Sequence, residues 1–220
     1  AYTYSKSLDE GAGGNSSTGE SRLNVQNPNN LRANYGLSNF NFKHRFTLSG
    51  IYQLPIGRGR HFLANSNRLV DGVAGGWQVT SILTLQSGPP LTLNMSTTTS
   101  NTGTLQRPNR TCNGNLPASQ QTIKRFYDTS CFVAPALYTF GNAGRNIIIG
   151  PGYEDWDFGL MKEFHPIERF ALQFRAESFN ALNHPNFSLP NGSIGSSAAG
   201  TISSTIGSQR EFQIALRLAW

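Results

Sequence analysis

Hydrophobic and polar residues alternate with a period of two in several stretches of about ten residues. The clearest stretch runs from Gln209 to Trp220. From Phe212 onward its even positions are all apolar, whereas its odd positions are polar or small. Successive side chains of a β-strand point to opposite faces, so this pattern predicts a strand with one apolar face.

The same alternation predicts four more strands and, less strongly, a sixth at the beginning of the chain; they cover residues 1–8, 44–54, 77–86, 155–164 and 168–179. At about 10 to 12 residues, most of these strands exceed the five or six residues usual in β-sandwiches. A tilted strand needs about 9–11 residues to cross a bilayer. The predicted fold class is therefore all-β: an antiparallel transmembrane β-barrel segment with about six long strands and long outer loops.

Composition agrees with this prediction. Hydrophobic residues make up 37% of the chain and no run of 18 apolar residues occurs, which excludes a transmembrane helix but leaves a barrel open. Aromatic residues stand near strand ends on the apolar face, where rings meet lipid headgroups. This predicts a membrane girdle formed by Trp77, Trp156, Phe170, Phe212 and Trp220.

Barrels of this kind have long outer loops and short periplasmic turns. If the last strand runs inward, residues 9–43, 87–154 and 180–208 become outer loops. Residues 165–167 become a tight periplasmic turn, and residues 55–75 a longer periplasmic connection. Short extra strands are expected in the outer loops, for example at 91–95 and 201–206.

Charged residues on the polar faces of the predicted strands are expected to face the lumen; they are Arg45, Asp157, Glu163, Arg175, Glu177 and Arg217. They form either a surface that contacts substrate or plug, or a ladder of opposite charges that stabilises the wall.

A second candidate site follows the strand that ends near Phe179. Asn and Pro residues suit a tight corner in which side chains bond to nearby backbone; the corner residues are Asn180, Asn183, His184, Pro185 and Asn186. A ligand role for these loop residues stays open.

Two cysteines, Cys112 and Cys131, lie in one polar stretch. They would be free thiols in a cytosolic protein and a disulfide in an exported one. The net charge is +6, but the basic residues do not cluster, so nucleic acid is not an expected partner. Metal-site, nucleotide-loop and nucleophile-elbow motifs are missing from the sequence, so we expect neither a cofactor nor enzyme activity.

Several segments together resemble one family: FRAESFNALNHPNF (174–187), REFQIALRLAW (210–220), YTYSKSLD (2–9), HRFTLSGIYQLPIG (44–57) and GGWQVTSILTLQSGPPLTL (75–93). They are similar to the C-terminal barrel of TonB-dependent outer-membrane receptors, in the branch with an N-terminal carboxypeptidase-regulatory-like domain. The resemblance covers nearly the whole chain and is weakest over residues 94–140.

The resemblance implies a bacterial outer-membrane barrel of about 22 strands around a plug. Residues 1–220 would form its C-terminal section, as a fragment or processed product. The implied function is energy-coupled uptake of a bulky nutrient of unknown identity. The implied partners are outer-membrane lipid, the TonB complex (through an N-terminal part not in this sequence) and the barrel-assembly machinery, for which the strand ending at Trp220 would be the signal.

One alternative is a secreted or surface-anchored β-sandwich or adhesive module without transport activity. A sandwich would bury Phe212, Leu216 and Leu218 in a dry core.

Overall fold

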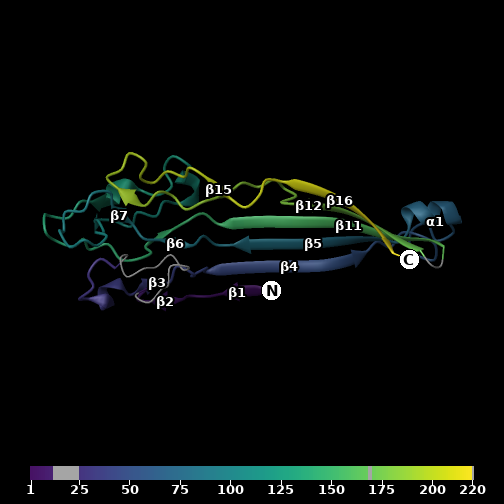
Figure 1. The fold of residues 1–220 in the computed structure, drawn as a ribbon, viewed down its shortest axis with the longest axis horizontal. Coiled ribbons are helices and arrows are strands. Elements are labelled where there is room, and N and C mark those ends of the chain that lie inside the picture. Colours follow the sequence, from purple (N-terminus) through teal and green to yellow (C-terminus); the bar gives the residue numbers. More distant parts are fainter. Residues whose placement is uncertain (12–24, 168–169, 220) are drawn as a thin grey trace.

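The computed structural model describes residues 1–11, 25–167 and 170–219 (Figure 1). Six strands form one antiparallel sheet in chain order; they are β1 (Tyr2–Tyr4), β4 (His44–Gln53), β5 (Trp77–Gln86), β11 (Tyr153–Ile167), β12 (Phe170–Phe179) and β16 (Glu211–Ala219). Each strand pairs with the next of the six along the chain. The all-β, antiparallel prediction is confirmed, and the sheet is open along β1 and β16.

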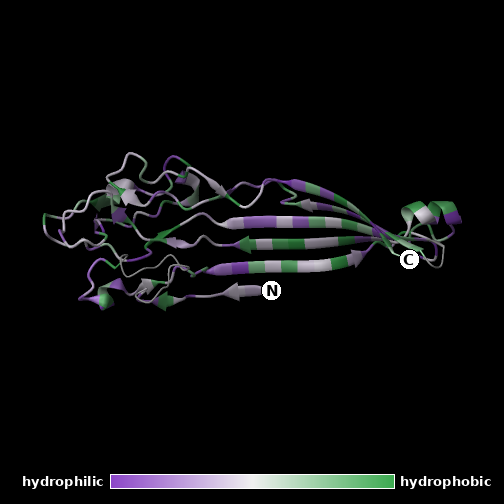
Figure 2. Cartoon of the chain, in the orientation of Figure 1, coloured by the Kyte–Doolittle hydropathy of each residue, from purple (hydrophilic) through white to green (hydrophobic). Residues whose placement is uncertain are grey.

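The pairing register gives the sheet two distinct faces. Leu160 lies opposite Val79 on β5 and Ala176 on β12, and Ala176 lies opposite Ile214 on β16. The neighbouring row joins Gly159 to Thr80 and Glu177 in the same way. Opposite residues share a face, so largely apolar and largely polar positions alternate along the long strands of the sheet (Figure 2). We call the two sides the apolar face and the polar face.

The apolar face is uncovered over β16, where Phe212 is 74% exposed and Leu216 68%. Among the described residues, no second sheet packs on this face. This arrangement disagrees with a β-sandwich, which would bury these side chains.

Connections of different length lie at opposite ends of the sheet (Figure 1). Residues 5–43, 87–152 and 180–210 gather at one end, which we call the outer end. The inner end carries the connection 54–76 and the hairpin between β11 and β12.

One expectation for the inner end was wrong. Residues 165–167 belong to β11 and do not form the turn, since Ile167 pairs with Phe170. The register shifts between Phe164 and Ile167, so Pro166 lies at an irregularity where its missing N–H is tolerated. The connection 54–76 contains a helix, α1 (Arg68–Ala74), that the sequence pattern had not indicated. None of the helices in the described part of the chain is long and apolar enough to cross a membrane.

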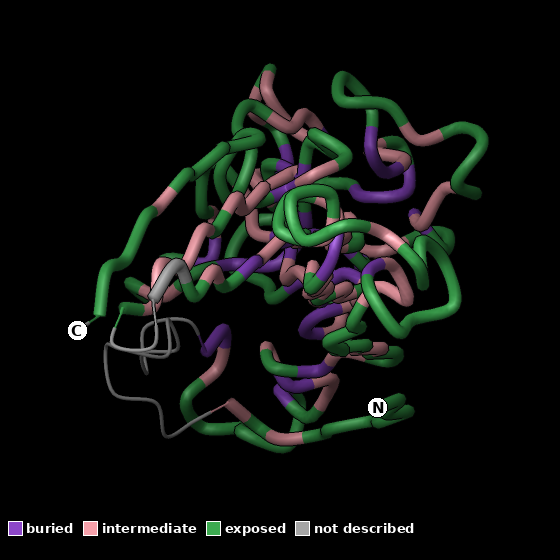
Figure 3. The backbone as a smooth tube through the Cα atoms, turned by 90° about the vertical axis from the view of Figure 1, so that its right-hand side faces the viewer, coloured by how far each residue is buried: buried purple, intermediate pink, exposed green. Residues whose placement is uncertain are grey.

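The outer connections form a compact region with its own hydrophobic core, whose buried side chains are Leu93, Tyr127, Cys131, Phe132, Ile148 and Ile194. Short elements organise it: β2 (Leu8–Asp9), β3 (Gly36–Leu37), β6 (Pro90–Leu91), β7 (Asn94–Met95), β8 (Asn109–Arg110), β9 (Phe132–Val133), β10 (Ile148–Ile149), β13 (Asn186–Phe187), β14 (Ser193–Ile194), β15 (Thr205–Ile206), and the 3-10 helices η3 (Leu31–Asn34), η4 (Ala118–Gln120) and η5 (Thr129–Cys131). Figure 3 shows buried segments inside the molecule, whereas the chain near the C-terminus is exposed. The outer loops are therefore folded and not irregular throughout.

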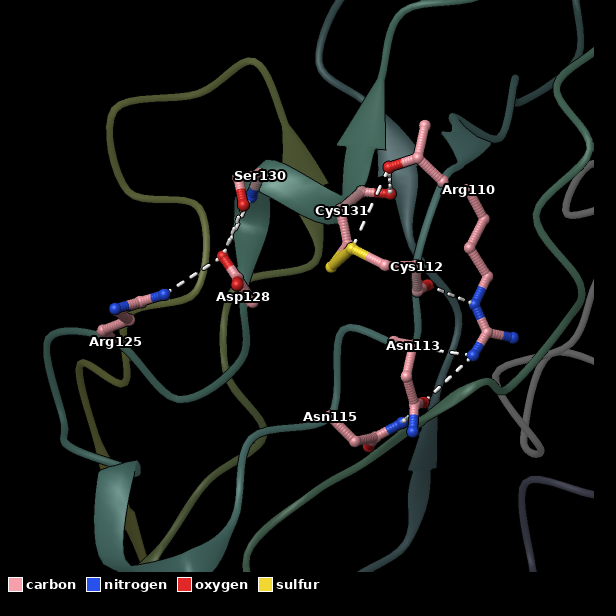
Figure 4. The surroundings of a disulfide bond; sticks show 9 residues. Arg110, Cys112, Asn113, Asn115, Arg125, Asp128, Ser130 and Cys131 are labelled. Atoms are coloured by element: carbon pink, nitrogen blue, oxygen red, sulfur yellow. Dashed lines mark hydrogen bonds and ion pairs between the residues drawn. A yellow bond between two sulfur atoms is a disulfide. The ribbon is translucent and has the colours of Figure 1, made fainter.

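A disulfide joins Cys112 to Cys131 within this region (Figure 4). The backbone carbonyls of both cysteines accept hydrogen bonds from side chains. Arg110 Nε donates to Cys112 O at 2.7 Å, and Thr111 Oγ1 donates to Cys131 O at 3.1 Å. The Thr111 bond extends the pairing of β8 with β9, in which Arg110 lies opposite Phe132.

Two buried arginines of the second outer connection bind the first. Arg145 Nε donates to Asn34 O at 3.1 Å, and Arg145 also forms an ion pair with Asp9. Burial of Asp9 alone would raise its pKa, but hydrogen bonds from Ser38 and Arg145 outweigh that effect and lower it. Arg107 donates to the side chain of Asn34, and its burial, helped by the nearby charge of Arg145, lowers the pKa of Arg107 to about 10.

Candidate functional site

The register puts all six charged residues of the first candidate site on the polar face. Arg45 is on β4, Asp157 and Glu163 are on β11, Arg175 and Glu177 on β12, and Arg217 on β16.

Direct charge pairs across the strands are not formed. Arg175 lies opposite Met161 and Ala215, and Arg217 lies opposite Gln173. Between described residues, Glu163 Oε1 lies 3.1 Å from Nε2 of His165 on its own strand. No two of the six charges are therefore directly opposed, and in the row that holds Glu163 and Arg217 the uncharged Gln173 lies between them.

Acidic side chains gather at the outer end of the polar face. Asp155, Asp157 and Glu211 line an open pocket of about 380 Å³, beside Tyr153 and Phe179. Sequence reasoning missed Glu211 and Tyr153 as site residues, because they come together only once β12 brings β11 and β16 to one site. In the part of the chain that the structure describes, no group of three His, Cys, Asp or Glu side chains is arranged to hold a metal ion.

The corner after β12 forms one wall of this pocket. The backbone N–H of Asn180 donates to Asp157 Oδ1 at 3.0 Å. The Asn180 side chain donates to His184 O at 3.0 Å and Ser208 O at 3.1 Å, and it accepts from His184 N at 2.9 Å. Asn180 and Asn183 have φ of 46° and 53°, a left-handed conformation that asparagine tolerates better than most residues. The corner is thus tied both to β11 and to the segment that leads into β16.

The other corner residues either form hydrogen bonds or line a groove. Asn186 pairs with the backbone of Glu154, accepting from its N–H and donating to its carbonyl, both at 2.8 Å. Asn183 Oδ1 accepts from Arg210 N at 3.1 Å. His184 and Pro185 line a larger groove of about 770 Å³ at the outer end of the apolar face, which also includes Phe46, Leu85, Phe126 and Phe187.

The expected girdle residues lie toward both ends of the apolar face. Trp77 and Phe170 are at the inner end, and Trp156 and Phe212 lie toward the outer end. Trp156 Nε1 donates to Ser81 Oγ at 2.8 Å, which satisfies the indole N–H. Trp220 lies outside the described residues.

The family assignment agrees with this geometry. A family profile described as "Outer membrane beta barrel domain" matches residues 1–213. The chain belongs to this outer membrane beta barrel family. The protein is therefore a β-barrel component of the bacterial outer membrane. No curated protein and no solved structure shows significant similarity to the chain.

Proposed function

We propose that this outer membrane beta barrel chain is the C-terminal wall of a TonB-dependent receptor that takes up a bulky nutrient. The observation that carries the proposal is the folded outer region beside a polar face. A barrel that served only as a membrane anchor would need neither an outer region with its own core and disulfide nor an acidic pocket at the outer end of its polar face. The family-like segments of the sequence support the same function.

In this proposal the apolar face contacts lipid and the polar face lines the lumen. Phe212, Leu216 and Leu218 are exposed apolar residues that water would not favour, whereas a hydrocarbon core would. The six charged residues of the polar face then line the water-filled interior, where they contact nutrient or plug. The aromatic residues Trp77, Trp156, Phe170 and Phe212 sit near the headgroups at the two membrane surfaces.

The acidic pocket gives the mouth of the lumen a chemical preference. Carboxylates at Asp155, Asp157 and Glu211 accept hydrogen bonds and repel anions. A nutrient that offers hydroxyl, ammonium or amide donors fits such a mouth. The proposal needs no catalytic step and no cofactor in this chain; its partners are lipid, the TonB complex acting through residues outside this sequence, and the barrel-assembly machinery.

A second candidate function is surface adhesion without transport. It is favoured by the size of the outer region, which presents exposed residues such as Tyr138 and Leu137 beyond the sheet. Adhesion requires the outer region alone, whereas uptake also requires the lumenal charges.

Growth and binding assays separate the two functions. A strain that lacks the gene is compared with the parent on limiting iron chelates, oligosaccharides and peptides, and complemented with the natural full-length protein or with its Asp155→Asn/Asp157→Asn variant. Uptake predicts a growth defect on one nutrient class, the same defect when TonB is inactivated, and only partial rescue by the variant. Loss of surface attachment with unchanged growth on every nutrient would overturn the transport proposal.

A further inference from the structure

The connection 54–76 at the inner end carries an apolar surface that the rest of the protein leaves uncovered. In helix α1, Leu69 is 82% exposed, Val73 is 72% exposed and Val70 is 42% exposed. These residues are spaced i, i+1 and i+4, so they lie within an arc of about 100° around the helix axis and form one apolar side. Phe62 and Leu63, in the loop before the helix, are also exposed.

The opposite side of α1 is held by the protein. Asn67 caps the first turn, accepting from Val70 N at 2.8 Å. Asp71 Oδ1 accepts from Arg58 N at 2.6 Å, which fixes the preceding loop against the helix. The side that bears Asp71 therefore faces the protein, and the side that bears Leu69 and Val73 faces away from it.

The attachment of α1 to the sheet is on the apolar face. Lys162, only 4% exposed, lies in the same cross-strand row as Trp77 and Phe174, and its Nζ donates to Gly75 O at the end of the helix. Its ammonium group also lies over the Trp77 ring, 5.5 Å from the centroid. Trp77 Nε1 donates to Val73 O at 2.9 Å. The helix is thus fastened to the end of the surface that contacts lipid, and its apolar side continues that surface.

Charge in the same connection is complementary to phospholipid. Residues 54–76 contain three arginines (Arg58, Arg60 and Arg68) and one acidic residue (Asp71). Basic residues beside an apolar helix side are typical of helices that lie in a headgroup layer that contains anionic lipid.

We propose that α1 is an interfacial helix that places Leu69, Val70 and Val73 among the phospholipids of the periplasmic leaflet and thereby fixes the depth of the barrel wall. This inference rests on the orientation given under Proposed function, with the apolar face toward lipid. Lys162 and Trp77 are then positioning residues that hold the helix at the membrane surface.

The test is site-directed spin labelling of the natural full-length protein in phospholipid nanodiscs, using the folded fraction alone. A label on Val73→Cys reports on the apolar side. A label on Arg68→Cys is the matched control, because Arg68 is exposed and lies about 140° around the helix from Val73. A label on Leu216→Cys, on the exposed apolar face of β16, is the lipid reference. Unsubstituted protein supplies the labelling background.

The proposal predicts that the Val73→Cys label resembles the Leu216→Cys label in its accessibility to oxygen. It should also be several-fold less accessible to a water-soluble nickel reagent than the Arg68→Cys label. Equal nickel accessibility at Val73→Cys and Arg68→Cys would place the helix in water and overturn the inference. Shielding of Val73→Cys from both reagents would indicate a protein partner, and spin–spin broadening would identify a second copy; either result overturns the lipid assignment. If the Leu216→Cys label is itself open to nickel, the orientation in Proposed function fails, and the inference fails with it.

Discussion

The backbone N–H of Asn180 donates to the carboxylate of Asp157 at 3.0 Å, so the corner after β12 is anchored on the polar face of β11. A residue counted as a lumenal charge is thus also part of the corner. Asp157→Ala removes the acceptor, whereas Asp157→Asn keeps an oxygen in its place. We expect the alanine variant to be less stable than the asparagine variant by about 1 kcal/mol. The temperature at which full-length protein unfolds in a heat-modifiability gel measures this difference; equal unfolding temperatures would show that the bond does not stabilise the corner.

The side chain of Asn180 makes three hydrogen bonds in the corner, and that of Asn183 makes one. Both residues have positive φ, which glycine adopts without strain. Asn180→Gly and Asn183→Gly are therefore matched variants that remove side-chain bonds without adding backbone strain. Asn180→Gly should cost about 1–3 kcal/mol and Asn183→Gly distinctly less. A protease digest of the 180–210 connection would measure the loosening, and a larger effect at Asn183 would contradict this account.

The Cys112–Cys131 disulfide closes a stretch with a sequence separation of 19 inside the outer core. Replacing both cysteines by serine should destabilise the outer region by about 3 kcal/mol in the loop-entropy picture. Neither cysteine belongs to the six-stranded sheet, so the folding of the sheet should be unchanged. Limited proteolysis on intact cells should show faster cleavage between residues 94 and 140, while heat-modifiable migration persists. Simultaneous loss of both would show that the outer region and the sheet fold as one unit.

The buried phenol of Tyr127 determines how the outer core responds to high pH. Burial raises the pKa of Tyr127 to about 12, although a backbone hydrogen bond from Gly200 acts in the opposite direction. The folded pKa lies above the ordinary value of 10.0, so the neutral phenol stabilises the core fully below pH 10. That contribution is lost as the pH rises through about 12. The phenolate absorbance that Tyr127→Phe removes should therefore appear near pH 12; its appearance near pH 10 in folded protein would contradict the burial of Tyr127.

Sequence alternation predicted the strands well, and one of them, Trp77–Gln86, to the residue. The reason is physical: in a strand that separates lipid from water, successive side chains point alternately into the two environments. The grouping of the long connections at one end of the sheet also followed from the lengths of the connections.

The outer core could not be predicted in this way. Leu93, Tyr127 and Ile194 come from three distant segments, and none of them belongs to a periodic pattern. Helix α1 was missed because it has seven residues and contains Gly72, and because its outward side is apolar. Lys162 was missed because its burial depends on α1, which covers it only after folding.

The most direct test of the central claim, that this sheet is a barrel wall between lipid and lumen, uses two neighbouring residues of β16. Leu216 lies on the apolar face and Arg217 on the polar face. Single variants Leu216→Cys and Arg217→Cys of the full-length protein, in intact outer membranes, are treated with a membrane-impermeant maleimide and then with a lipid-soluble one. We predict that Arg217→Cys reacts with the impermeant reagent, whereas Leu216→Cys reacts with the lipid-soluble reagent alone. Equal reaction of both positions with the impermeant reagent would contradict the account.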